Sequence, residues 1–340
     1  MLVSKTFDRL LVWLTVRKHN QASFSALRII FGVGLLLLLL PNFRERSFLW
    51  GEASFWVNAE AKRRGFWTFD TLFPKDNPLF FDLAYVTLTA LVVLFIIGAF
   101  TRIVLPVMLV MLVALQSNNP YVLNGGDTLI RITLLFMLFA NLTEHLSVDK
   151  FFRHRRLRNG KAPLKIVPSY VSNAAHNVGL ILCGFQIIVV YVVSGVWKLI
   201  GTEWLDGTAL FYALRIEQFM LYPALNELLW QSSPLIYLAT FLALWAQTLF
   251  PVLLLWRPSR IFALITLMGM HLGIALLMGL WPFSLAMIAL DMLFIRDSSW
   301  RWMLEIVSSR FGWSRLNVKS RGQTEPQVDP SSASTVGGSR

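Results

Sequence analysis

Long runs of apolar residues dominate this sequence, and they limit most strongly how the chain can fold. The runs at 24–41, 79–100 and 177–200 are close to the roughly 20 residues that a helix needs to cross the apolar interior of a membrane. In that interior every backbone amide needs a partner within the protein, and a helix supplies one for nearly every residue. The sequence therefore predicts membrane-spanning helices.

Composition supports a membrane protein. Of 340 residues, 56% are hydrophobic and only 15% are charged, whereas a soluble domain has about 25% charged residues. We expect an all-α fold, a polytopic helical bundle of about eight transmembrane helices. The predicted spans are 24–41, 79–100, 102–117, 128–143, 177–200, 234–256, 260–279 and 281–296.

The distribution of charge predicts the orientation. Most of the 31 Lys and Arg residues fall in segments on the same side as the N-terminus, and cytoplasmic loops carry the excess of Lys and Arg. The prediction is N-in and C-in, although loop 42–78 is basic and lies on the outer side. The basic run 150–165 is expected to meet anionic lipid headgroups. The net charge of +12 is therefore explained by contact with membrane lipids, and no nucleic-acid partner is expected.

Three regions are expected. Residues 1–22 resemble an amphipathic cytoplasmic helix, residues 23–297 form the transmembrane domain, and residues 298–340 form a cytoplasmic tail. The tail is rich in Ser, Pro and Gly and is expected to be disordered from about residue 322. The single cysteine, Cys183, lies in an apolar run, and we expect it to be a core residue. No metal site is expected.

Lys198 is the residue most suggestive of chemistry, because it ends an apolar run. A lysine in a membrane must reach water, find a partner or lose its proton, and a neutral amine is a usable base. Tyr191, Gly195 and Lys198 share one helix face, and Gly195 lets another helix approach closely. The alternative is a lysine whose amine snorkels to the outer interface.

Two further pairs of polar residues lie in the predicted spans. Asp127 and Arg131 are one helical turn apart, which predicts an ion pair that either fixes packing or shapes a site. His271 and Asp291 lie at matching depths of successive spans, which predicts a hydrogen bond between them. The alternative is a buried histidine without chemistry. The uncharged loop 118–126 has backbone amides suited to an anion or a quinone oxygen.

Several motifs occur in order along the chain. They are Asn119-Pro-Tyr121-Val-Leu-Asn124-Gly-Gly-Asp127, Ser147-Val-Asp149, Tyr191 to Gly207 with Lys198 and Trp204, His271, and Phe283-Ser284. Between Arg28 and Phe294 this series resembles the vitamin K-dependent gamma-glutamyl carboxylases and their bacterial relatives, the horizontally transferred transmembrane domain (HTTM) family.

The resemblance implies an outward-facing site in which a neutral lysine deprotonates a reduced naphthoquinone, either menaquinol or vitamin K hydroquinone. Lys198 falls at the position of that base, and His271 falls on a family histidine. The other expected site residues are supporting groups and quinone contacts. The supporting groups are Asp291, Asp127, Arg131, Tyr191 and Trp204, and the quinone contacts are Asn119, Tyr121, Asn124 and Gly195.

The chain departs from the carboxylases at two positions. Pro120 stands where they carry a histidine, and Trp197 stands where the animal enzymes carry a second lysine. The large globular domain that holds the protein substrate of the animal enzymes is not recognisable here. The substrate therefore stays open.

These features are consistent with two functions. The first is a carboxylase-like, lyase-like enzyme in a bacterial cytoplasmic membrane, which acts on a peptide or protein outside the cell. The second is a non-catalytic membrane factor in peptide toxin maturation or export, because some bacterial relatives resemble a component of a sporulation-delay system. A transporter would need an internal repeat, and we find none in the sequence.

Overall fold

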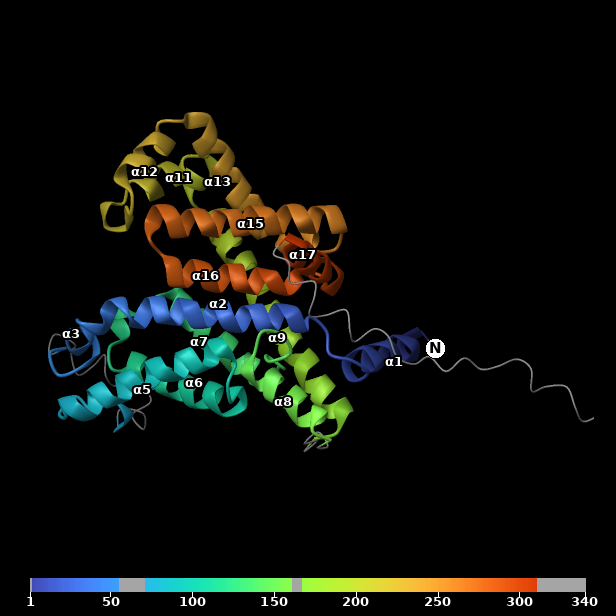
Figure 1. Ribbon diagram of the computed structural model, residues 1–340. Helices are drawn as coiled ribbons and strands as arrows, with labels where there is room; N and C mark the ends of the chain where they lie inside the picture. The colour runs from blue at the N-terminus through green and yellow to red at the C-terminus, as the bar shows by residue number, and fades with distance from the viewer. Residues whose placement is uncertain (1, 55–70, 161–166, 311–340) are drawn as a thin grey trace, which may run out of the picture. The chain divides into compact units, whose positions relative to one another are not determined.

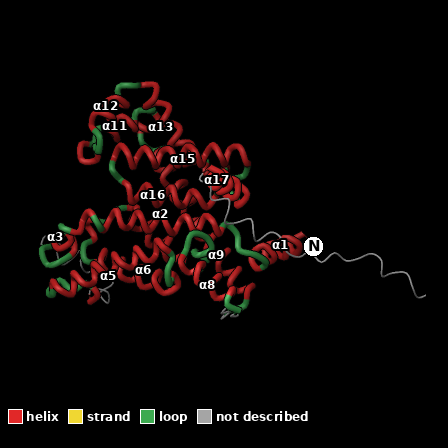
Figure 2. Tube along the Cα trace, viewed as in Figure 1, coloured by secondary structure: helices red, strands yellow, loops and turns green. Residues whose placement is uncertain are grey.

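All of the described secondary structure is helical. The computed structural model describes residues 2–54, 71–160 and 167–310, and within these ranges Figure 2 shows helices joined by loops and no strand. The predicted all-α class is confirmed. The predicted disorder beyond residue 322 lies outside the described residues.

Eight longer helices correspond to the eight apolar runs. They are α2 (Gln21–Leu39), α5 (Pro78–Ile97), α6 (Thr101–Ser117), α7 (Gly125–Met137), α9 (Ser169–Lys198), α13 (Ser233–Thr248), α15 (Arg257–Met278) and α16 (Trp281–Asp291).

Shorter helices connect or flank them. They are α1 (Leu2–Thr15), α3 (Arg46–Trp50), α8 (Val148–Arg158), α10 (Thr202–Leu205), α11 (Ala209–Leu214), α12 (Pro223–Trp230), α14 (Phe250–Leu253), α17 (Asp297–Arg310), and the 3-10 turns η1 (Pro41–Phe43), η3 (Pro120–Val122), η4 (Glu217–Phe219) and η5 (Met292–Phe294).

Four helical segments in the described ranges are long and apolar enough to cross a membrane. They are Gln21–Phe43, Pro78–Ile97, Ser169–Lys198 and Arg257–Met278. A fifth crossing is possible if α12 and α13, which meet at a bend of 94°, act as one broken span, and Thr101–Ser117 and Trp281–Phe294 are shorter apolar segments. The protein is therefore a helical membrane protein, while eight crossings and their direction stay predictions.

Helix α7 is shorter than the run from which it was predicted. It ends at Met137 rather than at residue 143, because the chain then turns and the Asn141 amide donates to Nδ1 of His176 on α9 (2.9 Å). A helix of 13 residues is about 20 Å long, which is less than the apolar thickness of about 30 Å.

Residues up to Asp297 form one compact unit, which contains every residue of the site described below. Within it, α16 packs between α2 and α15, and α5 packs on α2 and α6 (Figure 1). Helix α9 contacts α1, α7, α13 and α16. This arrangement places α9, α15 and α16 around a common interior.

Arg28 ties three segments together from inside the bundle. This fully buried side chain of α2 donates from Nη1 to the carbonyls of Phe95 (3.0 Å) and Ile96 (2.6 Å), and from Nη2 to the carbonyl of Leu146 (2.6 Å). Carbonyls at a helix C-terminus lack partners within the helix. Arg28 therefore caps the end of α5 and holds the chain after α7 against it.

The N-terminus of α9 holds the end of α1 in a similar way. The buried Asn177 side chain donates to the carbonyls of Leu14 and Arg17 (both 2.8 Å) and accepts from the His19 amide (3.1 Å). Nε2 of His176 bonds to the His19 carbonyl (2.6 Å). These bonds fix where α1 joins the bundle.

Candidate functional site

A chain of three buried polar side chains lies where α9, α15 and α16 meet. The Tyr191 hydroxyl lies 3.0 Å and 2.9 Å from the two carboxyl oxygens of Asp291. Nε2 of His271 lies 3.1 Å from the same hydroxyl. The predicted proximity of His271 and Asp291 therefore holds, but the predicted direct bond between them is wrong, because the phenol of Tyr191 stands between them.

Aromatic rings surround this chain and keep it dry. Tyr191 and Asp291 have no exposed surface, and His271 is 2% exposed. The ring of Phe250 packs edge-on against Tyr191 (4.8 Å between centroids), and the ring of Phe283 packs against His271 (5.5 Å). Polar groups in such surroundings depend on one another, because no other partner offsets the loss of water.

The geometry allows two arrangements of protons. In the first, Asp291 is ionised and accepts from the phenol, which accepts from N–H at Nε2 of His271. In the second, the chain holds one more proton: Asp291 donates to the phenol, the phenol donates to Nε2, and Nδ1 carries the histidine proton. Nδ1 of His271 is buried and has no hydrogen-bond partner among the described residues. The three groups can therefore pass a proton between Nδ1 and Asp291.

Lys198 ends α9 on the same side of the helix as Tyr191. Its Nζ donates to Oγ of Ser194 (2.7 Å) and lies 4.9 Å from the ring centroid of Trp204. The side chain is half-buried and has no ion pair within the described ranges. Tyr191 lies about two helical turns before Lys198 on α9. Lys198 and the three-residue chain therefore belong to one site.

The structure adds residues to this site that the sequence analysis did not single out. Ser194 stands four residues before Lys198, a spacing that places the two on one helix face and that was visible in the sequence. Phe250, which packs against Tyr191, has no comparable sequence signal. It belongs to α14, and only the fold brings α14 against α9.

Gly195 permits the close approach that its position suggested. A Cβ atom at this residue would lie 2.7 Å from the backbone nitrogen of Thr248 and 2.8 Å from its Cα. Since these are backbone atoms of α13, no side-chain rotation relieves the overlap. Gly195 therefore sets the spacing of α9 and α13 beside Lys198.

We expect Gly195→Ala to destabilise the protein by about 1–3 kcal/mol, as overpacking does, and to displace Lys198. The matched control is Gly184→Ala on the same helix, where a new Cβ would lie 3.8 Å from Phe294, an ordinary contact. The control is expected to be neutral or slightly stabilising. Thermal unfolding in detergent compares the two variants, and equal melting temperatures contradict the assignment.

Asp127 and Arg131 do not form the predicted ion pair. Asp127 accepts from the Asn124 amide (2.8 Å) and from Nε2 of Gln116 (3.0 Å), while Arg131 donates to Thr128 (3.3 Å). No ion pair joins the two in the described chain. The capping box at the start of α7 turns the carboxylate back toward the helix N-terminus, so it is directed away from Arg131.

The predicted quinone contacts in loop 118–126 serve first as structural groups. Asn119 donates to the Leu49 carbonyl (2.6 Å) and accepts from the Tyr121 amide (3.1 Å). Asn124 caps α7 by accepting from the Gly126 amide (2.7 Å). The Tyr121 side chain is exposed. The structure does not bring these residues into contact with Lys198, and their role toward a quinone stays a prediction.

Three hollows of the described chain are lined by other residues. One lies between α6, α7 and α9, another is apolar and lies along α13, and a third is lined by residues 71–76 with Ser117 and Asn118. Lys198 lines none of these three. Its nitrogen is instead covered by Ser194 and Trp204.

The apolar helices and the buried polar site define a polytopic helical membrane protein. Residues 16–300 match the sequence profile of the HTTM domain, which is most of the chain, and the protein belongs to the HTTM family. No curated protein and no solved structure matches it.

Proposed function

We propose that this protein is a quinol-dependent membrane enzyme in which Lys198 acts as the base. The observation that supports the proposal most strongly is the common face of α9. It presents the Lys198 amine beside Ser194 and, two turns away, the Tyr191 hydroxyl that joins His271 to Asp291. A base and a proton-holding chain within one bundle are the parts that proton abstraction requires.

The residues present fit the chemistry of a reduced naphthoquinone. Such a molecule offers apolar rings and two hydroxyl groups. The helices around α9 carry buried polar atoms that have no hydrogen-bond partner among the described residues. They are Nδ1 of His271, Oε1 of Gln247 and Oγ of Ser284. Trp204 and these groups would hold it, and Lys198 would act on it as the base. When bound, the quinol would supply the electrons for reaction with oxygen.

The work of the protein is to move and hold protons. Lys198 must be neutral when the quinol binds. Its N–H then continues to donate to Ser194, and the nitrogen lone pair accepts a proton. When a proton arrives at Nδ1 of His271, the proton on Nε2 passes to the Tyr191 hydroxyl. The hydroxyl in turn gives its own proton to Asp291. No charge is left on the histidine after this transfer.

The orientation of the site is part of the proposal. With eight crossings, N-in and C-in, α9 runs outward and Lys198 lies near the outer surface. The substrate is then a peptide or protein outside the cytoplasmic membrane of a bacterium. The excess of Lys and Arg on the other side supports this orientation.

The test is oxygen-dependent oxidation of menaquinol by the purified protein. We expect Lys198→Met to lower the rate by about 100-fold or more, as loss of a general base does. Lys5→Met, at an exposed residue of α1, is the matched control and should retain the full rate. Quinol binding, followed by quenching of tryptophan fluorescence, should survive in both variants.

Equal rates for Lys198→Met and Lys5→Met would exclude Lys198 as the base. If quinol also fails to quench the fluorescence of the wild-type protein, the quinol assignment is excluded too. The non-catalytic role in peptide maturation or export then replaces the enzyme.

A further inference from the structure

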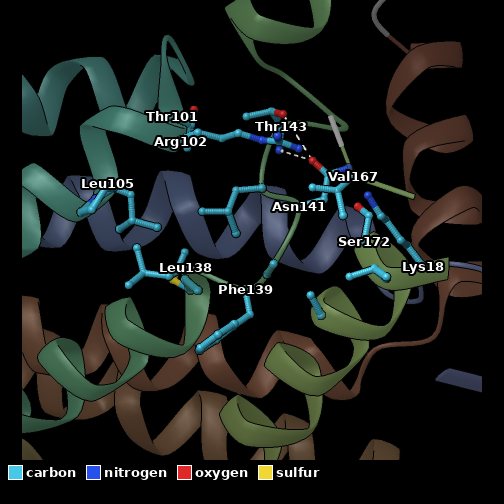
Figure 3. A pocket seen from close by; sticks show the side chains of 16 residues that line it. Lys18, Thr101, Arg102, Leu105, Leu138, Phe139, Asn141, Thr143, Val167 and Ser172 are labelled. Atoms are coloured by element: carbon cyan, nitrogen blue, oxygen red, sulfur yellow. Dashed lines mark hydrogen bonds between the residues drawn. The ribbon is translucent and has the colours of Figure 1, made fainter. Parts of the chain in front are cut away.

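A second polar site lies at one end of the bundle, far along α9 from Lys198. It is the hollow between the start of α6, the end of α7 and the start of α9, with a volume of about 380 Å³. Figure 3 shows Lys18 and Arg102 reaching it from different segments, with Asn141 and Thr143 on the loop after α7. We call it the inter-helix hollow.

The inter-helix hollow is lined by two positive side chains that form no ion pair with any described residue. Neither Lys18 nor Arg102 forms an ion pair in the described part of the chain, whereas the nearby Glu144 is occupied by Lys150 and Arg153. Burial, and then the charge of Arg102, lower the pKa of Lys18. The two cations therefore repel each other, and an anion between them would relieve that repulsion.

A neutral hydrogen-bonding group in the wall also lacks a partner. Thr101 is 4% exposed, and its hydroxyl has no hydrogen-bond partner among the described residues. Its backbone amide is already used, because it donates to Asp149 (3.0 Å). Buried hydroxyls normally have partners, so this hydroxyl keeps hydrogen-bonding capacity at the wall of the hollow.

Other lining residues of the inter-helix hollow form an apolar wall. It contains Leu105, Pro106, Leu138, Phe139 and Val171. Leu138, Phe139 and Val171 are each at least 40% exposed. One wall therefore suits a phosphate, and the other suits hydrocarbon.

We propose that the inter-helix hollow binds an anionic phospholipid, with its phosphate between Lys18 and Arg102 and its acyl chains along Leu138, Phe139 and Val171. A soluble phosphate ester shares the headgroup chemistry but leaves the apolar wall uncovered, so the lipid is the better match. Basic pockets between membrane helices are suited to such headgroups. This inference does not depend on the function of Lys198.

The test is native mass spectrometry of the detergent-solubilised protein titrated with dioctanoyl phosphatidylglycerol, dioctanoyl phosphatidylcholine or glycerol 3-phosphate. We expect phosphatidylglycerol to bind at least about 10-fold more tightly than either of the others, because only it matches both walls. Lys18→Gln with Arg102→Gln should remove the preference. The matched control is Arg257→Gln with Arg260→Gln, which removes two charges at the start of α15. This variant should keep the preference for phosphatidylglycerol.

A third variant guards against misfolding of the double variant. Val171→Trp keeps both cations and fills the hollow, and it should weaken phosphatidylglycerol at least about 10-fold. The proposal is overturned if Lys18→Gln with Arg102→Gln binds like its control, or if Val171→Trp binds like the wild type. If glycerol 3-phosphate binds as tightly as phosphatidylglycerol, the lipid proposal is overturned and the ligand is a soluble phosphate ester.

Discussion

Arg28→Met is expected to destabilise the protein by about 3 kcal/mol or more. The guanidinium is fully buried and satisfies carbonyls of Phe95, Ile96 and Leu146. Methionine fills similar space but donates nothing, so these carbonyls lose a charged donor worth about 1.5–3 kcal/mol per bond. Thermal unfolding in detergent should show the change, with Arg131→Met, which removes one long bond to Thr128, as the matched control.

A double-mutant cycle with Gly98 tests the same contact from the other side. Gly98 has a φ of +68°, and a Cβ there would overlap the guanidinium of Arg28 and, to a lesser extent, Cβ of Ser147. Gly98→Ala alone should therefore be strongly destabilising. Because Arg28→Met removes the overlapping guanidinium, the double variant should be more stable than the sum of the single effects predicts. Additive effects, or an Arg28→Met that melts like Arg131→Met, would contradict this account.

The helices could be predicted from the sequence, but their ends could not. Every predicted apolar run contains a helix, because a membrane interior leaves the backbone few alternatives. The early end of α7 depends instead on a bond between Asn141 and His176, residues that are 35 positions apart. Hydropathy carries no information about such a contact.

The composition of the site was predictable in part. His271 and Asp291 lie at matching depths in two adjacent helices, and this predicted correctly that they lie close together. The rotation of α9 that inserts Tyr191 between them depends on the packing of three helices. For Asp127, the helical spacing favoured Arg131, but the Asn124 amide and Gln116 compete for the same carboxylate. Local rules identify possible partners, and tertiary packing selects among them.

Tyr191→Phe is the second change expected to have a large effect. It removes one oxygen, and with it the hydrogen bonds that the structure gives Asp291 and Nε2 of His271. A buried carboxyl group without a partner costs about 1–3 kcal/mol, and more when it is charged. The variant should therefore unfold at a lower temperature and lose quinol oxidation, because a proton can no longer pass from His271 to Asp291.

The matched control is Tyr85→Phe. Tyr85 is also a fully buried tyrosine, and its hydroxyl donates to a single backbone carbonyl, that of Leu39 (2.8 Å). Its loss should cost about 1 kcal/mol and leave quinol oxidation unchanged. If Tyr191→Phe loses no more stability than Tyr85→Phe and keeps its activity, the three-residue chain has no functional role.

A double variant separates stability from proton transfer. Adding Asp291→Leu to Tyr191→Phe removes the stranded carboxyl group together with its lost partner. Since replacing both partners of a buried hydrogen bond by apolar groups can be nearly neutral, the double variant should regain much of the stability that Tyr191→Phe loses. It should stay inactive, because neither the relay nor its acceptor remains. If the double variant regains both stability and quinol oxidation, the three polar residues only support the packing of α9, α15 and α16.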